Sequence, residues 1–182
     1  MILKKKIGML SYVSPALVAA IAAPYPGAAI GGYITSRNMK NWYMTKLRKP
    51  WWRPPNYVFG PVWTVLYSSM GYASYLVYRD GGGWKGAARL PLLLYGSQLA
   101  LNWAWTPLFF GKKWLGLACL ELVVLNINIA ACIWTFADIN ITASYLMLPY
   151  LAWGLFATGL NYWIYDNNRD GKHLQFRNNK GE

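Results

Sequence analysis

The chain has 182 residues, of which 55% are hydrophobic and 17% aromatic, and its formal net charge is +12 at pH 7. The apolar residues gather in long blocks instead of alternating as in a soluble core, so the sequence predicts a single membrane domain over residues 1–182. Lysines and arginines lie between these blocks and at the tails, without a basic face or an aromatic RNA-binding signature, which argues against nucleic acid as a partner. His173 is the only histidine, which excludes histidine triads and multi-histidine metal sites.

Five apolar blocks predict an all-α membrane protein, a five-transmembrane-helix bundle, because about 20 residues of α-helix cross about 30 Å of hydrocarbon. The predicted spans cover about residues 10–36, 56–78, 91–110, 114–136 and 143–165, and a polar basic tail follows at 166–182. The predicted connections are a basic loop at 37–55, a glycine-rich turn at 79–89, a tight link at 111–113 and a short turn at 137–142.

Prolines shape the first span and the loop after it. Pro24 and Pro26 fall in mid-span and predict a kink. In the loop, the prolines of the run 49–63 hold the backbone extended. The same run contains Trp51 and Trp63 among four Trp and Tyr residues, a density typical of the boundary between hydrocarbon and water. The run is therefore an interfacial aromatic belt, or a lid joined to a membrane span.

Five spans place the two termini on opposite sides of the membrane, and the basic residues indicate which side is which. Six of the 18 lysines and arginines fall on the N-terminal side and the other twelve on the side of the first loop and the C-terminus. The excess predicts a cytosolic C-terminus, although the three lysines at positions 4–6 oppose that orientation.

Few polar side chains lie inside the predicted spans. They are Glu121, Gln98, Asn102, Asn126, Asn128 and Asn161. At that depth a polar group needs a partner or a cavity, and for the asparagines hydrogen bonding between helices is favoured over ligand contact. Glu121 is either protonated, hydrogen-bonded to the amides of the third span, or exposed to a wet pocket, and a pocket role and a structural role have equal support.

The third span presents two distinct faces. Gln98, Asn102 and Trp105 share one face by helical spacing, which suits a ligand. Gly96, Ala100 and Ala104 form a second face that allows close helix packing. Packing inside the monomer is the favoured use of this second face, and a homodimer is the alternative.

Several motifs in this order resemble the TspO/MBR translocator family, also called the peripheral-type benzodiazepine receptor family, and are close to its animal mitochondrial members. The similarity covers about residues 14–168. The matching motifs are Lys49-Pro50 through Pro54-Pro55, Gly60-Pro61-Val62-Trp63, the run from Gln98 to Trp105, Pro149 to Trp153, and Ala157 to Tyr162.

The resemblance implies a five-helix bundle with a pocket under the first loop that binds tetrapyrroles such as protoporphyrin IX, cholesterol and benzodiazepine-type drugs. It implies no cofactor, the tetrapyrrole being a ligand, and membrane lipid as a further partner. The implied ligand-binding residues are Trp51, Phe59, Trp63, Asn102, Trp105, Leu117, Glu121, Trp153, Ala157 and Leu160. Aromatic walls with a few polar anchors suit a flat apolar ligand.

Three positions depart from the family. Leu117 stands where animal members often have tryptophan, which weakens stacking on a ligand, and Glu121 stands where many have aspartate. In the family's sterol motif, Leu160 and Tyr162 match but Asp166 replaces the arginine. A shifted set of Leu160, Tyr165 and Arg169 still fits the loose pattern.

The resemblance favours a non-enzymatic receptor in the mitochondrial outer membrane with a cytosolic C-terminus, one that binds, sequesters or hands on its ligand. One alternative is a light-dependent porphyrin-degrading enzyme, for which Trp63 and Tyr162 are the candidate redox residues. Another is a scaffold for partner proteins. Ordinary hydrolytic chemistry has no acid and base pair or metal cluster to support it.

Overall fold

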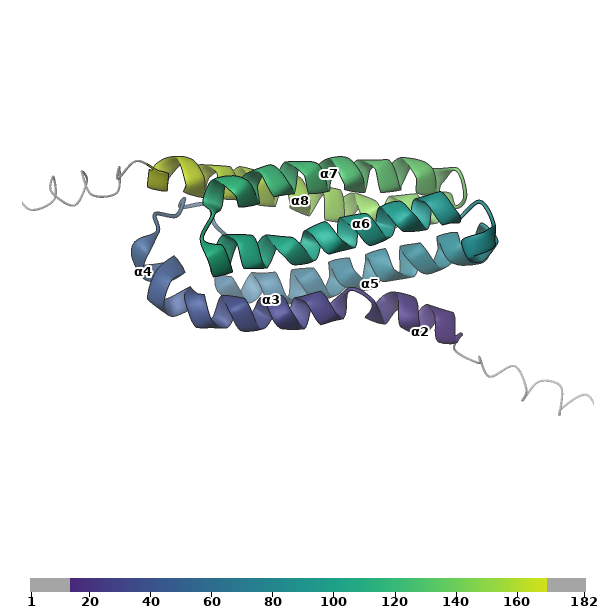
Figure 1. The fold of residues 1–182 in the computed structure, drawn as a ribbon, viewed down its shortest axis with the longest axis horizontal. Helices are drawn as coiled ribbons and strands as arrows, with labels where there is room; N and C mark the ends of the chain where they lie inside the picture. Colours follow the sequence, from purple (N-terminus) through teal and green to yellow (C-terminus); the bar gives the residue numbers. More distant parts are fainter. Residues whose placement is uncertain (1–13, 170–182) are drawn as a thin grey trace, which may run out of the picture.

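The computed structural model describes residues 14–169, and every regular element in that range is helical. The elements are α2 (Pro15–Ala22), α3 (Tyr25–Asn38), the π-helix η1 (Met39–Tyr43), α4 (Met44–Lys46), α5 (Asn56–Asp80), the 3₁₀-helix η2 (Gly83–Lys85), α6 (Arg89–Thr106), the π-helix η3 (Pro107–Lys112), α7 (Leu115–Ala137) and α8 (Ile141–Asn168). The long helices run side by side as an elongated bundle (Figure 1). The all-α fold class is confirmed for this part of the chain.

The N-terminal helical stretch is interrupted where the prolines predict it. α2 ends at Ala22 and α3 begins at Tyr25, so the kink is at Pro24. Just after this break, Trp103 of α6 donates a hydrogen bond to the Pro24 carbonyl, at 3.1 Å from its Nε1. The Trp103 ring packs against Gly27, where a Cβ would overlap the indole. Glycine is therefore required for α3 to lie this close to α6.

The predicted basic loop at 37–55 is wrong in its first half, because helix continues through η1 and α4 to Lys46. Local contacts extend it: Arg37 donates to the Tyr33 hydroxyl one turn earlier, and Asn38 to the Ile34 carbonyl. The helix ends where the Lys49 ammonium donates to the carbonyls of three residues, Tyr43, Met44 and Leu47. A cation suits the negative end of a helix.

Two further boundaries differ from the prediction. The link expected at 111–113 begins later, since η3 continues α6 to Lys112 and only Lys113 and Trp114 connect it to α7. α8 extends to Asn168, so the predicted tail begins as helix, and its remainder lies outside the described residues. Prediction from hydropathy misses both because polar residues at a helix end lower hydropathy without ending the helix.

The core of the bundle is formed by one large apolar cluster and a smaller one at the end near α4. The large cluster joins α5, α6, α7 and α8 through fully buried side chains such as Met70, Ile129, Met147 and Tyr150. The smaller cluster consists of Tyr43, Phe109, Phe110, Ala118, Leu160 and Ile164. It packs the π-helical segments η1 and η3 against α7 and α8.

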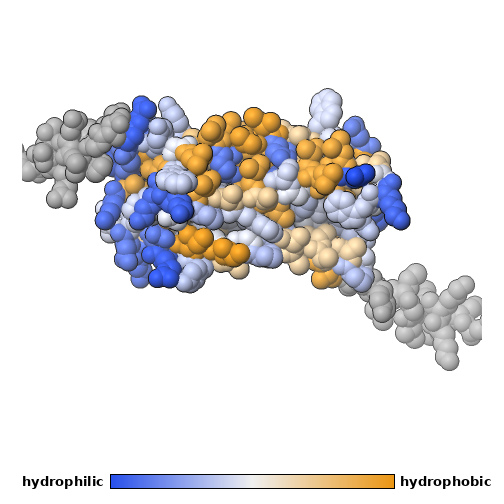
Figure 2. All heavy atoms as spheres, viewed as in Figure 1, coloured by the Kyte–Doolittle hydropathy of each residue, from blue (hydrophilic) through white to orange (hydrophobic). Residues whose placement is uncertain are grey.

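On the face that Figure 2 shows, apolar side chains are concentrated along the middle of the bundle and polar side chains at its ends, above all at the end near α4. Exposed apolar side chains include Ile30, Leu93, Ile127 and Leu155. By length and composition, three stretches of the described chain could cross a membrane: Pro15–Lys46, Leu115–Ala137 and Ile141–Asn168. An apolar belt of this kind matches a hydrocarbon environment.

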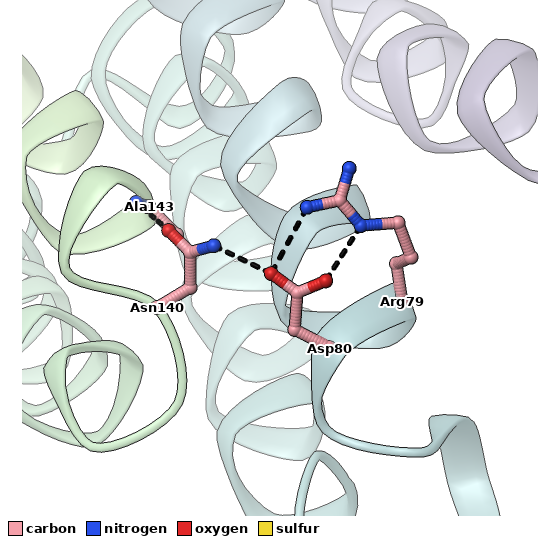
Figure 3. A network of polar contacts seen from close by, with 4 residues as sticks. All are labelled: Arg79, Asp80, Asn140 and Ala143. Atoms are coloured by element: carbon pink, nitrogen blue, oxygen red, sulfur yellow. Dashed lines mark hydrogen bonds and ion pairs between the residues drawn. The ribbon is translucent and has the colours of Figure 1, made fainter.

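A polar clasp closes the end of the bundle opposite α4 (Figure 3). Asp80, the last residue of α5, pairs with Arg79 at 2.6 Å and accepts a hydrogen bond of 2.6 Å from Asn140. The Asn140 side chain also accepts from the Ala143 amide and so caps α8. The hydrogen bonds from Arg79 and Asn140 hold the pKa of the Asp80 carboxyl below its usual value.

Candidate functional site

A buried amide joins three helices at the centre of the candidate site. Asn102 of α6 accepts a hydrogen bond of 2.8 Å from the Tyr67 hydroxyl of α5. Its Nδ2 donates to the Tyr150 hydroxyl of α8 at 3.0 Å. All three side chains are buried. Asn102 therefore satisfies two tyrosine hydroxyls that would otherwise lie unpaired in an apolar core.

Trp63 lies against this polar bridge. Its ring centroid is 5.1 Å from that of Tyr67 and 6.3 Å from that of Tyr150, and Tyr25 of α3 packs edge-on against Tyr67 at 5.8 Å. Trp63 itself is only partly buried. One side of its ring therefore faces the bridge while the rest stays accessible.

Nearer the α4 end, Trp105 continues the aromatic wall. Its Nε1 donates to the Asn161 side chain at 3.1 Å, and its ring stacks on Phe109 with centroids 4.9 Å apart. Asn161 in turn donates to the Leu115 carbonyl at the start of α7. This arrangement ties α6, α7 and α8 together through one indole and one amide.

The side of the site near residues 47–55 is also aromatic. These residues connect α4 to α5 without forming a helix, and we call them the extended segment. They make one turn at Trp51 and Trp52, where the Arg53 amide donates to the Pro50 carbonyl at 3.2 Å. Phe59 contacts Trp153 with centroids 5.7 Å apart, and Trp153 contacts Phe156 at 5.3 Å. Trp52 packs on Phe156 at 5.8 Å, whereas Trp51 is 94% exposed. The extended segment thus packs Trp52 against the aromatic residues of α8 and leaves Trp51 exposed.

The remaining predicted ligand-binding residues occupy different environments. Leu160 is buried, Ala157 is partly buried, and Leu117 is 47% exposed. Glu121 is buried, and neither of its carboxyl oxygens has a hydrogen-bond partner within the described residues. Of the three alternatives for Glu121, the hydrogen bond to the third-span amides is therefore not formed. The Asn102 amide donates to Tyr150 instead, and the Gln98 amide makes a 4.0 Å contact to the sulfur of Met70.

The predicted role of the asparagines in joining helices is confirmed. Besides Asn102 and Asn161, Asn126 of α7 donates to Thr158 of α8 at 2.8 Å, and Asn128 donates to Ser97 of α6 at 2.7 Å. The Asn126 side chain lies against Gly154, where any Cβ would overlap its oxygen.

The predicted sterol and redox residues do not share one face. Leu160 points into the core, whereas Tyr162 is 58% exposed. Arg169 pairs with Asp166 at 2.8 Å and lies over the Tyr165 ring at 5.7 Å. Tyr162 therefore faces outward, whereas Trp63 packs on the buried tyrosines.

The small-residue face of α6 is not packed inside the monomer, contrary to the favoured expectation. A Cβ added at Gly96 would meet no atom within 4 Å, and Ala100 is exposed. The neighbouring helices reach α6 elsewhere, as at Trp103. The face is therefore available to another molecule.

Sequence reasoning missed two residues of the polar bridge, Tyr67 and Tyr150. Tyr67 lies four residues after Trp63, on the same helical face, and this spacing was the available signal. Tyr150 follows Pro149 within a recognised motif, but its pairing with Asn102 is visible only in the fold.

Comparison with known proteins agrees with this architecture. Residues 20–166 match the TspO/MBR family, a stretch that contains all ten predicted ligand-binding residues. The chain belongs to the TspO/MBR family.

Relatives from animals and bacteria support this membership. The chain is 43% identical to the translocator protein of Homo sapiens over 155 residues, which cover 84% of this chain and 91% of that protein. It is 45% identical over 116 residues to translocator protein 2 of Mus musculus, covering 63% and 72% of the two chains. The tryptophan-rich sensory protein of Cereibacter sphaeroides is 40% identical over 121 residues, covering 66% and 73%.

Family membership and the apolar helices together identify an integral membrane protein. The names of these relatives refer to translocation and to sensing.

Proposed function

We propose that this protein is a membrane receptor that binds tetrapyrroles such as protoporphyrin IX, together with cholesterol and benzodiazepine-type drugs, and sequesters or hands on these ligands. The observation that carries the proposal is the aromatic cluster around Asn102. Trp63, Tyr67 and Tyr150 surround one amide that joins three helices. Rings with few polar anchors suit a flat apolar molecule.

Ligand entry requires aromatic contacts to separate, because the rings of the cluster touch one another. The Phe59 to Trp153 contact lies beside the extended segment that bears Trp51 and Trp52. This segment is the proposed lid. Displacing it would open a path between α5 and α8 toward Asn102.

Glu121 is the proposed polar anchor deep in the site. Glu121 is buried, and neither oxygen of its carboxyl has a hydrogen-bond partner among the described residues. A buried polar group without a hydrogen-bond partner destabilises the folded protein. A ligand that supplies a donor or acceptor to Glu121 would remove this penalty and would therefore bind more tightly.

The proposed membrane arrangement has five spans. α5 and α6 have 25 and 18 residues, which gives lengths of about 37 and 27 Å at the helical rise. Both pack beside the three apolar stretches that could cross a membrane alone. The proposed location is the mitochondrial outer membrane with the C-terminus cytosolic, and the excess of basic residues on the side of the first loop and the C-terminus supports this orientation.

Cholesterol is proposed to bind on the outer surface of α8 instead of inside the cluster. Tyr162 is exposed there, and Tyr165 lies next to Arg169. Unchanged photo-cholesterol labelling in Tyr162→Ala and Arg169→Ala would remove this part of the proposal.

The open face of α6 favours a homodimer through Gly96, Ala100 and Ala104. Gly96→Leu should abolish cross-linked dimers in bilayers if this face forms the interface, because a bulky side chain prevents close helix approach. A dimer that persists in this variant would exclude the face.

The receptor proposal is tested by titrating the full-length protein in nanodiscs, in the dark, with protoporphyrin IX while tryptophan fluorescence is followed. Trp63→Ala should weaken a saturable quench. Eleven tryptophans contribute to the fluorescence signal, so a second tryptophan variant is needed as a control. Trp134→Ala serves this purpose, because Trp134 is 77% exposed on the outside of α7. Non-saturable quenching, equal in both variants, would mean that the porphyrin only partitions into lipid.

The same samples distinguish the alternative functions. Illumination that converts protoporphyrin IX into product, and fails to do so in Trp63→Phe, would favour the porphyrin-degrading enzyme. Absence of both saturable binding and turnover would leave the scaffold role.

A further inference from the structure

A second cavity lies at the α4 end of the bundle, apart from the aromatic cluster. Its volume is about 270 Å³. It lies where α4 ends, α7 begins and α8 ends. The lining residues are Trp42, Lys46, Leu47, Lys113, Leu115 and Asn168. We call it the interfacial cavity, and it shares no residue with the predicted ligand-binding set.

The walls of the interfacial cavity combine positive charge with apolar surface. Lys46 and Lys113 are exposed, so their ammonium groups can reach both the cavity and its mouth. The Lys113 ammonium lies 5.5 Å from the centre of the Trp42 ring. Trp42, Leu47 and Leu115 supply the apolar part. This mixture suits a ligand with an anionic group attached to carbon chains.

Lys113 is held in an unusual backbone conformation at this cavity. Its φ of 62° makes it the one residue other than glycine with a positive φ in the described chain. Its backbone N–H and that of Trp114 both bond to the Leu108 carbonyl, which fixes the turn. Lysine is disfavoured in this conformation, where glycine or asparagine would fit better. Such residues concentrate at functional sites.

The floor of the cavity is built by contacts between distant parts of the chain. Asn168 accepts a hydrogen bond of 2.9 Å from the Arg48 amide and donates to the Arg48 carbonyl at 3.2 Å. It also donates to the Ile164 carbonyl at 2.6 Å. The segment after α4 is thereby fastened to the end of α8, so the cavity forms with the fold.

The surroundings favour an anion. Basic residues at this end of the bundle include Arg37, Lys40, Lys49, Arg53, Lys112 and Arg169. Among the residues of this end that the structure describes, Asp166 is the acidic residue of α8, and Arg169 pairs with it. The polar surface that Figure 2 shows at this end borders the apolar belt, at the depth of lipid headgroups.

We propose that the interfacial cavity binds the phosphate headgroup of an anionic membrane phospholipid, with Lys46 and Lys113 on the phosphate and Trp42, Leu47 and Leu115 against its glycerol and first acyl carbons. A freely soluble phosphate would use the two lysines but gain nothing from the apolar wall. Basic pockets between membrane helices recognise anionic headgroups in this way.

The test measures lipid binding to the purified full-length protein in detergent by native mass spectrometry. Phosphatidylglycerol is compared with phosphatidylcholine of the same acyl chains. Lys113→Asn removes the charge while asparagine tolerates a positive φ. Lys46→Gln removes the second charge. Lys85→Asn, at the opposite end of the bundle, is the matched control.

Phosphatidylglycerol should bind the wild type in preference to phosphatidylcholine. Each of Lys113→Asn and Lys46→Gln should weaken phosphatidylglycerol binding about fivefold, and Lys85→Asn should leave it unchanged. The unfolding midpoint of Lys113→Asn should equal or exceed that of the wild type. That result would mean that the weaker lipid binding of this variant does not come from unfolding.

Three results would overturn the proposal. Equal binding of the two lipids would remove the role of the anion. An equal loss in Lys85→Asn would mean that only overall charge matters. Displacement of the lipid by millimolar inorganic phosphate would assign the cavity to a soluble anion.

Discussion

Replacing Asn102 by leucine tests the polar bridge most directly, because the leucine side chain has the same number of heavy atoms and the same branch at Cγ but no hydrogen-bonding group. The change removes the bonds of 2.8 Å and 3.0 Å to Tyr67 and Tyr150 and leaves both hydroxyls unpaired. Hydrogen bonds between membrane helices average about 0.6 kcal/mol with a maximum of about 1.7. Unpaired buried hydroxyls add to that loss, so the expected destabilisation is about 1–3 kcal/mol.

A double-mutant cycle with Tyr67→Phe sharpens the test. In the wild-type background, Tyr67→Phe breaks one bond and should cost about 0.6–1.7 kcal/mol. In the Asn102→Leu background it removes a hydroxyl that already lacks its partner, so it should be neutral or stabilising. Equilibrium unfolding in mixed micelles measures all four proteins.

Two results would refute this reasoning. Additive effects of the two substitutions would mean that Tyr67 and Asn102 are not coupled. A free energy of unfolding for Asn102→Leu equal to that of the wild type would mean that the bridge contributes nothing to stability. Asn128→Leu is the control, because its bond to Ser97 lies at the exposed edge and its loss should cost less.

Other predictions concern the helix contacts and the clasp. Gly27→Ala should lower the free energy of unfolding by about 1–3 kcal/mol, since the added Cβ would overlap Trp103. Gly159→Ala is the control: its Cβ meets no atom within 4 Å, so it should raise the free energy of unfolding by about 0.5–1 kcal/mol. Equal effects of the two substitutions on the free energy of unfolding would contradict the close packing at Gly27. Asn140→Ala should cost about 1 kcal/mol by removing the cap of α8, measured by the same unfolding curves, and no loss would contradict the capping role. Because its partners lower the pKa of Asp80 in the folded protein, the charged carboxylate contributes stability above a pH of about 4, and this contribution is lost as pH falls through the lower folded pKa. The unfolding midpoints of Asp80→Asn and wild type should therefore differ at pH 7 and converge in acid, and a difference independent of pH would contradict the clasp.

The sequence predicted the helical class and the main helices well, because long apolar blocks report directly on elements that contact lipid. It also predicted the break at Pro24, since proline acts locally on its own helix. It placed a loop at residues 37–46 where helix continues. Basic residues there lower the hydropathy without ending the helix. Lys49 then completes the helix end by donating to the carbonyls of Tyr43, Met44 and Leu47, and hydropathy does not register such hydrogen bonds.

The candidate site could be predicted in its residue types and only partly in its arrangement. Asn102 and Trp105 share a face because helical spacing is fixed, and the structure keeps both toward the bundle. The partners of Asn102 come from α5 and α8, and no pattern within one helix specifies them. The exposed face at Gly96 could not be predicted for the same reason. Helical spacing shows that Gly96, Ala100 and Ala104 share a face, but it does not show which helix, if any, packs against that face.

The proposed function requires that one site in the aromatic cluster bind both porphyrin and drug. The most direct measurement is competition in nanodiscs kept dark, with protoporphyrin IX bound first and an aromatic amide drug added in increasing amounts. We expect complete displacement of the porphyrin at saturating drug in the wild type, and weakened binding of both molecules in Trp63→Ala but not in Trp134→Ala. Porphyrin that stays bound at saturating drug, with both variants alike, would contradict the claim.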